Sequence, residues 1–570
     1  MSKRQNIFLF FIIVSFCFLS FSTTLNIGFI WDDHQMIVEN PYIKSLNSYN
    51  FMHNIFSNAF NQEGANYYRP LQLFSYMLDF KFFKLNPSFW HLVNLSFHCL
   101  NSILLFLLLK RINFSLKLSL LASLLFAVNP IVVEQMIIIA GRAELMSFTF
   151  TLLSILLYLK GDMLSFILSL LSFVLSMFSK ESGVITPFII ILILNFLKKD
   201  YSKKILFYFL LIAFYLSLRK AAVSGEILGI GYIQFFKTLF LKAPYMIFNY
   251  FYKTILPFNL HSHNMYPDFN IYSYLVLSAL FLYAIYKLFA YNRELALFSF
   301  LWYFLFLIPK LPLLSSQDLI LDHWIYPSNA ALYILLAVLI LKIEDIKKRY
   351  IFPIAILSSW IFFSNYNISL RDNDIKLYEN AIKYRTSSKV YYNLSREYYI
   401  LGDFKKSREL LENVFEKNKD DEMFVNAYSL ILMKTGDRDK ARDLLLKLFS
   451  KGPNMSMSYL NLSSLYIEDK KYDKALDILF AGLAKFPDNE NIELYLARVF
   501  GLKKEKTMAY MILKDIVYFN PYNIEALLNL GLIEFENRNY SSSKSHFEKV
   551  LEIDRENQLA LEYLNRIKSR

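Results

Sequence analysis

Up to about residue 365 the sequence is a succession of apolar stretches, each about 14 to 25 residues long, separated by short polar loops. A bilayer needs about twenty apolar residues per crossing helix, and lipid offers an exposed backbone no hydrogen-bond partners. Any of these stretches that enters a membrane must therefore be helical. The chain is 55% hydrophobic with a mean hydropathy of +0.32, which is too apolar for an ordinary soluble protein.

Eleven candidate membrane spans can be placed in this region. The first follows Ser2-Lys3-Arg4 and has no small-residue cleavage site behind it, which indicates an uncleaved signal anchor. We expect residues 1–365 to form a polytopic helix bundle in which residues 27–88 are the first outer loop. The spans are roughly residues 7–25, 89–109, 118–138, 144–159, 163–178, 184–197, 204–218, 272–290, 295–309, 329–342 and 351–365.

The cations gather in alternate loops between these spans. With the N-terminus in the cytoplasm, the inner loops carry most of the Lys and Arg residues, for example in 110–117, 198–204 and 342–349. The outer loops after the fifth and ninth spans carry only Lys180 and Lys310. This asymmetry follows the positive-inside rule. Eleven crossings then place both the first outer loop and the C-terminal region outside the cytoplasm.

One further apolar segment, at about residues 238–258, contains Lys and Pro. We interpret it as a helix that lies along the outer membrane interface. If it crosses the membrane instead, the topology of everything after it reverses.

From about residue 388 the sequence changes to amphipathic helices with a period of about 34 residues, which is typical of tetratricopeptide repeats. We expect an α-solenoid over residues 388–570, with five repeats, a capping helix and a concave groove that binds an extended partner. The repeats are 388–421, 422–455, 456–489, 490–523 and 524–557, followed by the cap at 558–570. Small residues recur at one position of each repeat, at Ser395, Ser429, Ser463, Ala497 and Gly531, and again twelve residues later, at Ser407, Ala441, Ala475, Ala509 and Ser543. Small side chains at these positions let the two helices of a repeat approach closely.

Charge and cysteine usage exclude several classes of function. The net charge of +13 comes mainly from the inner loops, and no basic patch interleaved with aromatic residues indicates a nucleic-acid partner. The two cysteines, Cys17 and Cys99, both lie in apolar stretches. They form no disulfide framework, zinc motif or nucleophile pattern.

Polar residues recur in or beside the outer loops, although ionisable groups at membrane depth are costly and are functional candidates by default. An interhelical hydrogen bond is an equally good explanation for any single one of them, and the clustering on one side favours a site. His91, Asn94 and His98 share one face of the second span because of their helical spacing. The full set is Asp32, Asp33, Arg69, His91, Asn94, His98, Glu134, Arg142, Glu144, Lys180, Glu181, Asp322 and His323.

The order of the motifs resembles a known family. The acidic pair is followed by "YRPL", "HLVNLSFH", "LFAVNPIVVE", "GRAE" and "SKESG" over residues 1–185, and by "LDHWIYP" near 321–327. Together with the appended solenoid, this order is similar to the transmembrane-and-tetratricopeptide O-mannosyltransferases and their bacterial relatives, which are GT-C-type glycosyltransferases. Two positions depart from the family pattern, since Asn129 stands where the family often has His and His323 where it often has Arg.

The resemblance implies an all-α membrane domain with an outer active site and a polyprenyl-phosphate sugar as donor. The spacing of the carboxylates does not indicate a metal, and such a transfer requires no metal and no cofactor. Transfer from such a donor needs a base for the acceptor hydroxyl and cations for the departing phosphate. Either Asp32 or Asp33 would be the base, because a neighbouring carboxylate raises the pKa toward neutrality. Arg69, Arg142 and Lys180 would hold the phosphate. Residues that would orient donor or acceptor are His91, His98, Glu134, Glu144, Glu181, Asp322 and His323.

These expectations define a membrane glycosyltransferase that transfers a sugar such as mannose to a hydroxyl of a protein or glycan recruited by the repeats. The Lys-, Asn-, Ile- and Phe-rich composition favours a bacterial inner membrane, with the repeats in the periplasm, although an ER membrane would obey the same topology rules. The first alternative is a non-enzymatic membrane-anchored scaffold that displays the repeats to envelope proteins. The second is a polymerase, ligase or transporter of lipid-linked oligosaccharides, although a transporter would need polar residues near the midplane of its spans.

Overall fold

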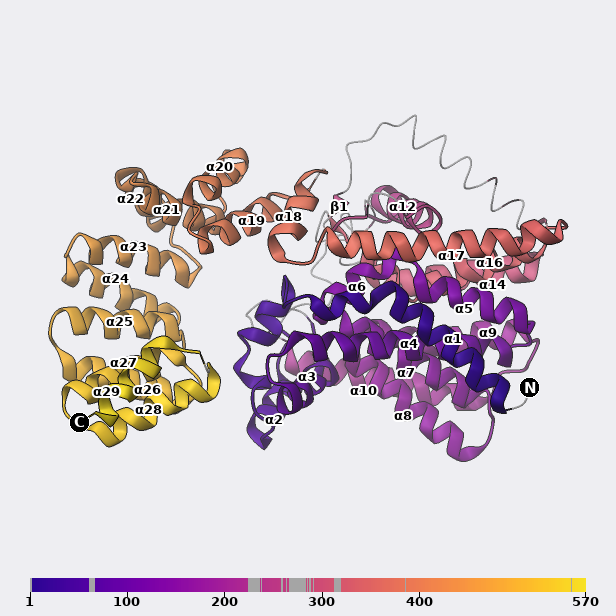
Figure 1. The fold of residues 1–570 in the computed structure, drawn as a ribbon, viewed down its shortest axis with the longest axis horizontal. Helices are drawn as coiled ribbons and strands as arrows, with labels where there is room; N and C mark the ends of the chain where they lie inside the picture. Colours follow the sequence, from indigo (N-terminus) through magenta and orange to yellow (C-terminus); the bar gives the residue numbers. More distant parts are fainter. Residues whose placement is uncertain are drawn as a thin grey trace. The chain divides into compact units, whose positions relative to one another are not determined.

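The computed structural model describes residues 3–60, 67–223, 236, 238–257, 260–262, 264–265, 283, 286, 289–290, 292–311, 319–384, 386–554 and 556–569. The chain forms two compact units, Met1–Val390 and Tyr391–Arg570. Both are built from helices (Figure 1). Among the described residues the one sheet is a pair of two-residue antiparallel strands, β1 (Asn264–Met265) and β2 (Leu319–Ile320), in which Asn264 pairs with Ile320.

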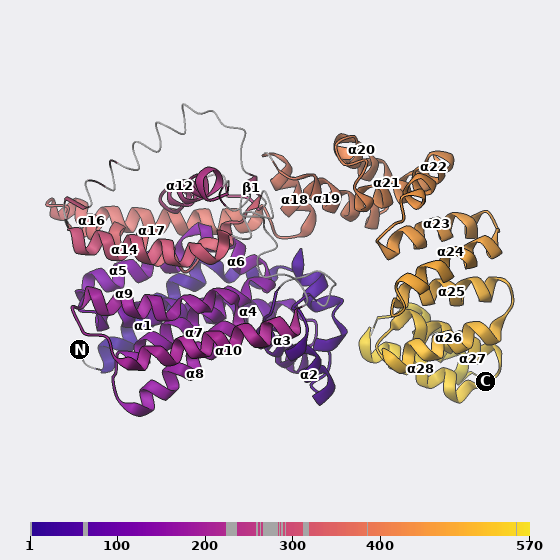
Figure 2. The ribbon, with the colours of Figure 1, turned by 180° about the vertical axis from the view of Figure 1, so that it is seen from behind.

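Apolar helices of 11 to 25 residues make up most of the first unit. They are α1 (Lys3–Phe21), α4 (Pro87–Arg111), α5 (Leu116–Val128), α7 (Arg142–Tyr158), α8 (Met163–Ser179), α9 (Thr186–Phe196), α10 (Leu206–Ala222), α14 (Arg293–Leu307), α16 (Asn329–Leu341) and α17 (Ile346–Ser369). Helix α4 packs against α1, α5 and α7, and α7 packs along α8 (Figures 1 and 2).

Polar residues in the loops start these helices. Asn86, Ser115 and Asp162 each accept a hydrogen bond from a main-chain N–H in the first turn of the helix that follows, which satisfies a donor that the helix leaves unpaired. Pro87 stands at the first position of α4, where its missing N–H has no consequence. The sequence therefore marks the helix starts through loop residues as well as through apolar length.

The predicted spans coincide with helices, with two differences. The span predicted at 118–138 is broken at Asn129–Pro130 into α5 and a short run that includes η4 (Pro130–Val132) and α6 (Val133–Ile137), bent by 45°. Proline disfavours helical backbone in the residue before it, which explains the break. The span predicted at 272–290 falls largely outside the described residues.

Five of the described helices are long and apolar enough to cross a membrane, or six if the bent pair counts as one span. They include α1, α4, α7, α10 and α17, while α8, α16 and the segment Glu181–Phe196 are shorter apolar helices. The count of about eleven crossings stays a prediction. The segment predicted to lie along the interface contains α12 (Ala243–Ile255), in which Lys253 is buried.

Shorter elements lie between or after the long helices of the first unit. They are η1 (Ser22–Asn26), η2 (His34–Val38), η3 (Pro41–Ile43), α2 (Ser48–Phe56), α3 (Pro70–Phe83), η5 (Ile139–Gly141), η6 (Glu181–Ile185), η7 (Lys203–Ile205), η8 (Thr238–Lys242), η9 (Ile308–Lys310), η10 (Asp322–Ile325) and α18 (Asp374–Ile382). Several of them carry the polar residues singled out in the sequence.

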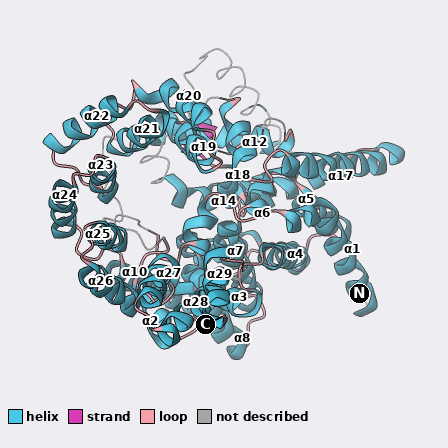
Figure 3. Cartoon of the chain, turned by 60° about the vertical axis from the view of Figure 1, so that its left-hand side comes forward, coloured by secondary structure: helices cyan, strands magenta, loops and turns pink. Residues whose placement is uncertain are grey.

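The second unit is a succession of helix pairs that follow one another around an arc (Figure 3). The pairs are α19 (Ser388–Ile400) with α20 (Phe404–Phe415), α21 (Glu422–Thr435) with α22 (Arg438–Ser450), α23 (Ser456–Glu468) with α24 (Tyr472–Lys485), α25 (Glu490–Leu502) with α26 (Lys506–Phe519), and α27 (Ile524–Glu536) with α28 (Tyr540–Ile553), followed by α29 (Gln558–Lys568).

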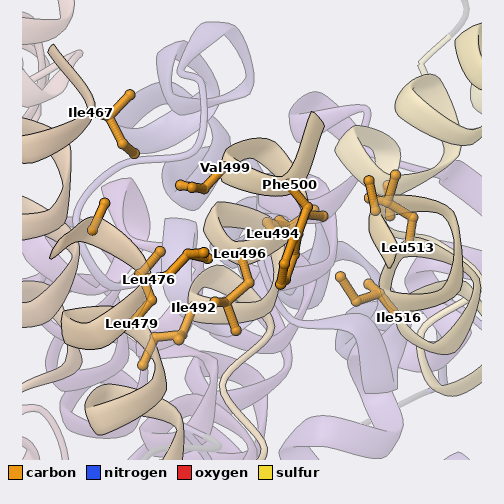
Figure 4. Packing of buried hydrophobic residues seen from close by; sticks show 14 of the residues in the cluster. Ile467, Leu476, Leu479, Ile492, Leu494, Leu496, Val499, Phe500, Leu513 and Ile516 are labelled. Atoms are coloured by element: carbon orange, nitrogen blue, oxygen red, sulfur yellow. The ribbon is translucent and has the colours of Figure 1, made fainter. Parts of the chain in front are cut away.

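Small residues stand where the helices of a repeat meet, as the period predicts. Ser395 and Ser407 hydrogen-bond each other across the first pair, and Ser543 donates to the Gly531 carbonyl across the fifth. A Cβ added at Gly531 would lie 2.8 Å from the Phe547 ring, closer than carbon atoms pack. The middle repeats share one apolar core that includes Leu479, Ile492 and Leu513 (Figure 4).

Candidate active site

A small cavity in the first unit, lined by apolar and charged side chains, collects residues from five parts of the chain. Its volume is about 90 Å³. The segments that form it are the loop after α1, the approach to α3, the α6–η5 turn, the α8–η6 junction and η10. Its lining residues are Trp31, Asp32, Met36, Phe60, Tyr67, Arg69, Glu134, Ile138, Ala140, Gly141, Lys180, Leu321, His323 and Trp324.

The two carboxylates of the acidic pair have different surroundings. Asp33 is fully buried and accepts three main-chain hydrogen bonds, from Ala140 N at 2.7 Å, Ile139 N at 3.0 Å and Ile30 N at 3.3 Å. Burial raises the pKa of Asp33 to about 7, and the three N–H donors oppose that rise. Its oxygens therefore bind the segment after α1 to the turn before α7.

Asp32 points into the cavity instead. Among the described residues its carboxylate makes no hydrogen bond or ion pair, and it lines the cavity together with Arg69, Glu134 and His323. Burial raises the pKa of Asp32 to about 6, against the pull of His323 and Arg69. A carboxylate with this pKa is charged at neutral pH and can still take up a proton.

The backbone beside Asp32 is held in an unusual conformation. Trp31 has a φ of +54°, in the left-handed region that costs a bulky residue about 1–3 kcal/mol. The N–H of Trp31 donates to Asp374 Oδ1 at 2.8 Å, and His34 Nε2 lies 2.8 Å from Asp374 Oδ2. Asp374 is the first residue of α18. The Asp374 carboxylate, from far along the chain, therefore binds Trp31 before Asp32 and His34 after it.

Arg69 immediately precedes α3 and lines the cavity. Its Nε donates to Glu181 Oε2 at 3.2 Å, its guanidinium stacks on the Tyr67 ring at 4.6 Å, and Glu181 Oε1 accepts from Tyr68 N at 2.9 Å. Because Glu181 and Tyr67 fix one side of the guanidinium, Arg69 is pre-positioned at the cavity wall.

A second cation, Lys180, belongs to a buried charge cluster. Glu144 Oε2 lies 2.5 Å from Lys180 Nζ and 2.8 Å from Lys310 Nζ. The cluster thus has two lysine side chains and one glutamate, and Lys180 alone of the three lines the cavity. Burial lowers the pKa of Lys180 to about 7, against the pull of Glu144.

Glu134 and His323 also line the cavity and contact each other. Glu134 Oε2 accepts from His323 N at 3.2 Å, and Oε1 lies 3.2 Å from the ring nitrogen Nδ1. Gln135 Nε2 donates to the His323 carbonyl at 2.7 Å. These bonds fix η10 against α6, so the two residues present a defined polar pair to the cavity.

Arg142, which the sequence assigned to the phosphate, does not line the cavity. It is fully buried and forms an ion pair with Asp79. Its other contacts include hydrogen bonds to Asn94 Oδ1, the Trp90 carbonyl and Ser75 Oγ, and stacking against Tyr76 and Trp90. The side chain joins α3, α4 and α7, so Arg142 is not among the residues that the cavity brings together.

The two histidines of α4 are likewise buried away from the cavity. His91 contacts the carbonyls of Met136 and Gly28, and His98 contacts the Tyr326 hydroxyl and the Ala127 carbonyl. Asp322 is buried and pairs with Lys253 at 2.8 Å. These residues fix helices and loops around the cavity, and Glu144 and Glu181 reach it only through their partners Lys180 and Arg69.

The sequence did not single out the partners that bury these charges, namely Asp79, Lys253 and Asp374. The available signal for Lys253 was its position inside an apolar stretch. An unpaired ammonium group there would be too costly, so a carboxylate partner could be expected. Within the described residues, no group of three or more His, Cys, Asp or Glu side chains has the geometry to hold a metal ion.

The chain is similar to tetratricopeptide repeat proteins and to proteins named O-mannosyl-transferases. The family model described as "Tetratricopeptide repeat" matches residues 388–421 and 524–557, which are the first and fifth repeats predicted from the period. Protein O-mannosyl-transferase TMTC3 of Mus musculus is 33% identical over 156 residues, which cover 26% of this chain and 16% of that protein. Protein O-mannosyl-transferase Tmtc1 of Drosophila melanogaster is 30% identical over 174 residues, 29% of this chain and 20% of that protein.

The resemblance found in the sequence is thus confirmed, and each of these matches spans a fifth or less of the relative's length. Among solved structures, a thermophilic tetratricopeptide repeat protein of Thermus thermophilus is 18% identical with a TM-score of 0.30, covering 32% of this chain and all of that one. A tetratricopeptide repeat protein of Parabacteroides merdae is 12% identical with a TM-score of 0.32, covering 42% and 91%.

Proposed function

We propose that the protein is a membrane glycosyltransferase that moves a sugar from a polyprenyl-phosphate donor to a hydroxyl of a protein or glycan on the extracytoplasmic side. The observation that carries the proposal is Asp32, a carboxylate without a hydrogen-bond partner among the described residues, which faces a cavity walled by Arg69 and Lys180. The relatives named O-mannosyl-transferases make mannose the first sugar to test.

In the proposed reaction Asp32 is the general base. The acceptor hydroxyl oxygen attacks the anomeric carbon, its proton passes to the Asp32 carboxylate, and the bond from that carbon to the phosphate oxygen breaks. The polyprenyl phosphate leaves with the bonding electron pair. A positioned base contributes typically 10²–10⁴-fold to such a step, and the raised pKa of about 6 lets Asp32 accept the proton in a partly dehydrated site.

Arg69 and Lys180 are suited to hold the donor phosphate. Arg69 uses its Nε toward Glu181, which leaves the outer nitrogens of the guanidinium fork as candidates for two phosphate oxygens. An anionic phosphate beside Lys180 would favour its charged form, because a nearby opposite charge raises an ammonium pKa. The donor would in this way complete the charge balance of the cluster with Glu144 and Lys310.

The remaining walls suit a sugar ring. Glu134 and His323 offer hydrogen-bond groups to sugar hydroxyls, and Trp31, Tyr67 and Trp324 offer flat apolar surfaces. Pockets with apolar walls and a few convergent polar groups are typical of small-ligand sites. We assign Glu134 and His323 to orientation of the sugar.

The solenoid would recruit the acceptor. Between α25, α26 and α27 it contains a cavity of about 500 Å³ whose lining mixes apolar residues such as Leu494 with charged residues such as Arg498 and Glu525. Such a mixed groove fits an extended polypeptide better than a free sugar. In the proposed arrangement the N-terminus is cytoplasmic and the repeats face the periplasm of a bacterium.

The direct test uses the full chain purified in detergent, with synthetic polyprenyl-phosphate sugars and peptides or glycans from the host envelope. Asp32→Asn should bind the donor as the unaltered protein does and lose about 10²–10⁴-fold in transfer. Arg69→Ala should weaken donor binding as well as transfer. Normal envelope glycosylation in a strain with Asn at both 32 and 33 would end the proposal and leave the scaffold function.

A further inference from the structure

We infer that Asp374, near the end of the first unit, is a positioning residue that holds Asp32 in its productive orientation. The inference rests on the proposed role of Asp32 as the base. The observations behind it concern the backbone on both sides of Asp32 and the carboxylate that binds it.

The Asp32 carboxylate makes no hydrogen bond or ion pair among the described residues, so its orientation must come from its neighbours. On its C-terminal side, Asp33 is bound to the N–H groups of Ile139 and Ala140. On its N-terminal side, Trp31 N donates to Asp374 Oδ1 at 2.8 Å. The position of Asp32 is therefore fixed by the carboxylates of Asp33 and Asp374, each of which is hydrogen-bonded to main-chain N–H groups.

Trp31 needs this external support because of its backbone conformation. A non-glycine residue at a φ of +54° is strained, and such strain persists only where surrounding contacts hold it. Without the bond to Asp374, we expect the peptide unit between Ile30 and Trp31 to relax toward negative φ. That rotation would swing the following residue, which is Asp32.

Asp374 also contacts the helical turn after Asp32. His34 Nε2 lies 2.8 Å from Asp374 Oδ2, and the Asp374 side chain is 11% exposed. One buried carboxylate thus joins residues 31 and 34 across the turn that presents Asp32. It comes from α18, which follows the last apolar helix of the first unit, so it ties the loop to a different part of that unit.

The neighbouring residues indicate that Asp374 positions Asp32 and is not needed to cap its own helix. Helix α18 is capped by Asn373, whose side chain accepts from Lys376 N. Asp372, two residues before Asp374, is an exposed carboxylate that pairs with Lys376 on the surface. Asp372→Ala is therefore a matched control that removes a charge from the same turn without touching residues 31–34.

The experiment measures sugar transfer by the purified full chain, with kcat separated from the KM for a synthetic polyprenyl-phosphate sugar. Asp374→Ala should lower kcat on the order of 10²-fold, the effect of a misplaced catalytic group, with KM changed by less than about threefold. Asp374→Asn keeps an oxygen for the Trp31 N–H and should recover most of the rate. Asp372→Ala should leave kcat unchanged.

A second measurement separates this inference from the proposed function. Amide hydrogen exchange of residues 30–37 should rise in Asp374→Ala and in His34→Ala, and stay unchanged in Asp372→Ala. In an Asp32→Asn background, Asp374→Ala should cause no further loss of transfer, because it acts through Asp32. A full additional loss there, or unchanged exchange over 30–37, would overturn the positioning role. Full transfer by Asp32→Asn alone would instead refute the proposed base.

Discussion

The acidic pair gives a prediction in which two adjacent and chemically identical residues respond differently to the same substitution. Asp33 Oδ1 accepts from Ala140 N, and Oδ2 accepts from Ile139 N and Ile30 N, all within 3.3 Å and all buried. In Asp33→Asn one of these oxygens becomes an NH₂ group. Whichever way the amide turns, it faces at least one main-chain donor with another donor.

The cost follows from the desolvation of the unpaired group. A buried donor left without an acceptor costs about 1–3 kcal/mol, which lowers a melting midpoint by on the order of 2–6 °C in a domain of a few hundred residues. Asp32→Asn removes no hydrogen bond seen among the described residues, so its effect on stability should stay within about 0.5 kcal/mol.

The assay is thermal unfolding of the detergent-purified full chain at pH 8, above the pKa of both carboxyls. The expected order is unaltered protein and Asp32→Asn together, with Asp33→Asn melting lower. An Asp33→Asn protein that melts with the unaltered chain would refute the division of roles, and so would an Asp32→Asn protein that is the less stable of the two.

Further predictions concern the solenoid and the topology. Residues 388–570 expressed alone should fold as a helical domain. In this domain Gly531→Ala should cost about 1–3 kcal/mol of stability through overlap with Phe547. The higher helix propensity of Ala offsets up to about 1 kcal/mol of that cost. Gly501, also helical, has nothing within 4 Å of an added Cβ, so Gly501→Ala should not destabilise, and equal urea midpoints for the two variants would mean that the register is wrong. An alkaline-phosphatase fusion after residue 366 should be active, because we place the repeats outside the cytoplasm, and an inactive fusion would contradict that topology.

The helices of both units could be predicted because their signals are local. Apolar length and loop residues such as Asn86 and Asp162 mark the helices of the first unit. The 34-residue recurrence of small residues marks the second, where Gly531 and Ser543 meet as expected. Each of these patterns depends on residues near one another in the chain.

Which charged residues line the cavity, and which are paired elsewhere, could be predicted only in part. Sequence alone placed Asp32, Arg69, Glu134, Lys180 and His323 in one group, and the structure brings all five to one cavity. It could not separate Asp32 from Asp33, because their orientations depend on a turn at Trp31 and on N–H groups more than 100 residues away. It also assigned Arg142 to the phosphate, since nothing local reveals that Asp79, on another helix, neutralises it.

The central claim, that Asp32 is the general base, is tested most directly by the pH dependence of kcat/KM for sugar transfer. The base works only when deprotonated, and burial raises its pKa from 3.8 to about 6. We therefore expect kcat/KM to fall about tenfold per pH unit below pH 6 and to level off above it. In Asp32→Asn the residual transfer should lose this acid limb. A limb that stays near pH 6 in Asp32→Asn would show that another group takes the proton and would contradict the account.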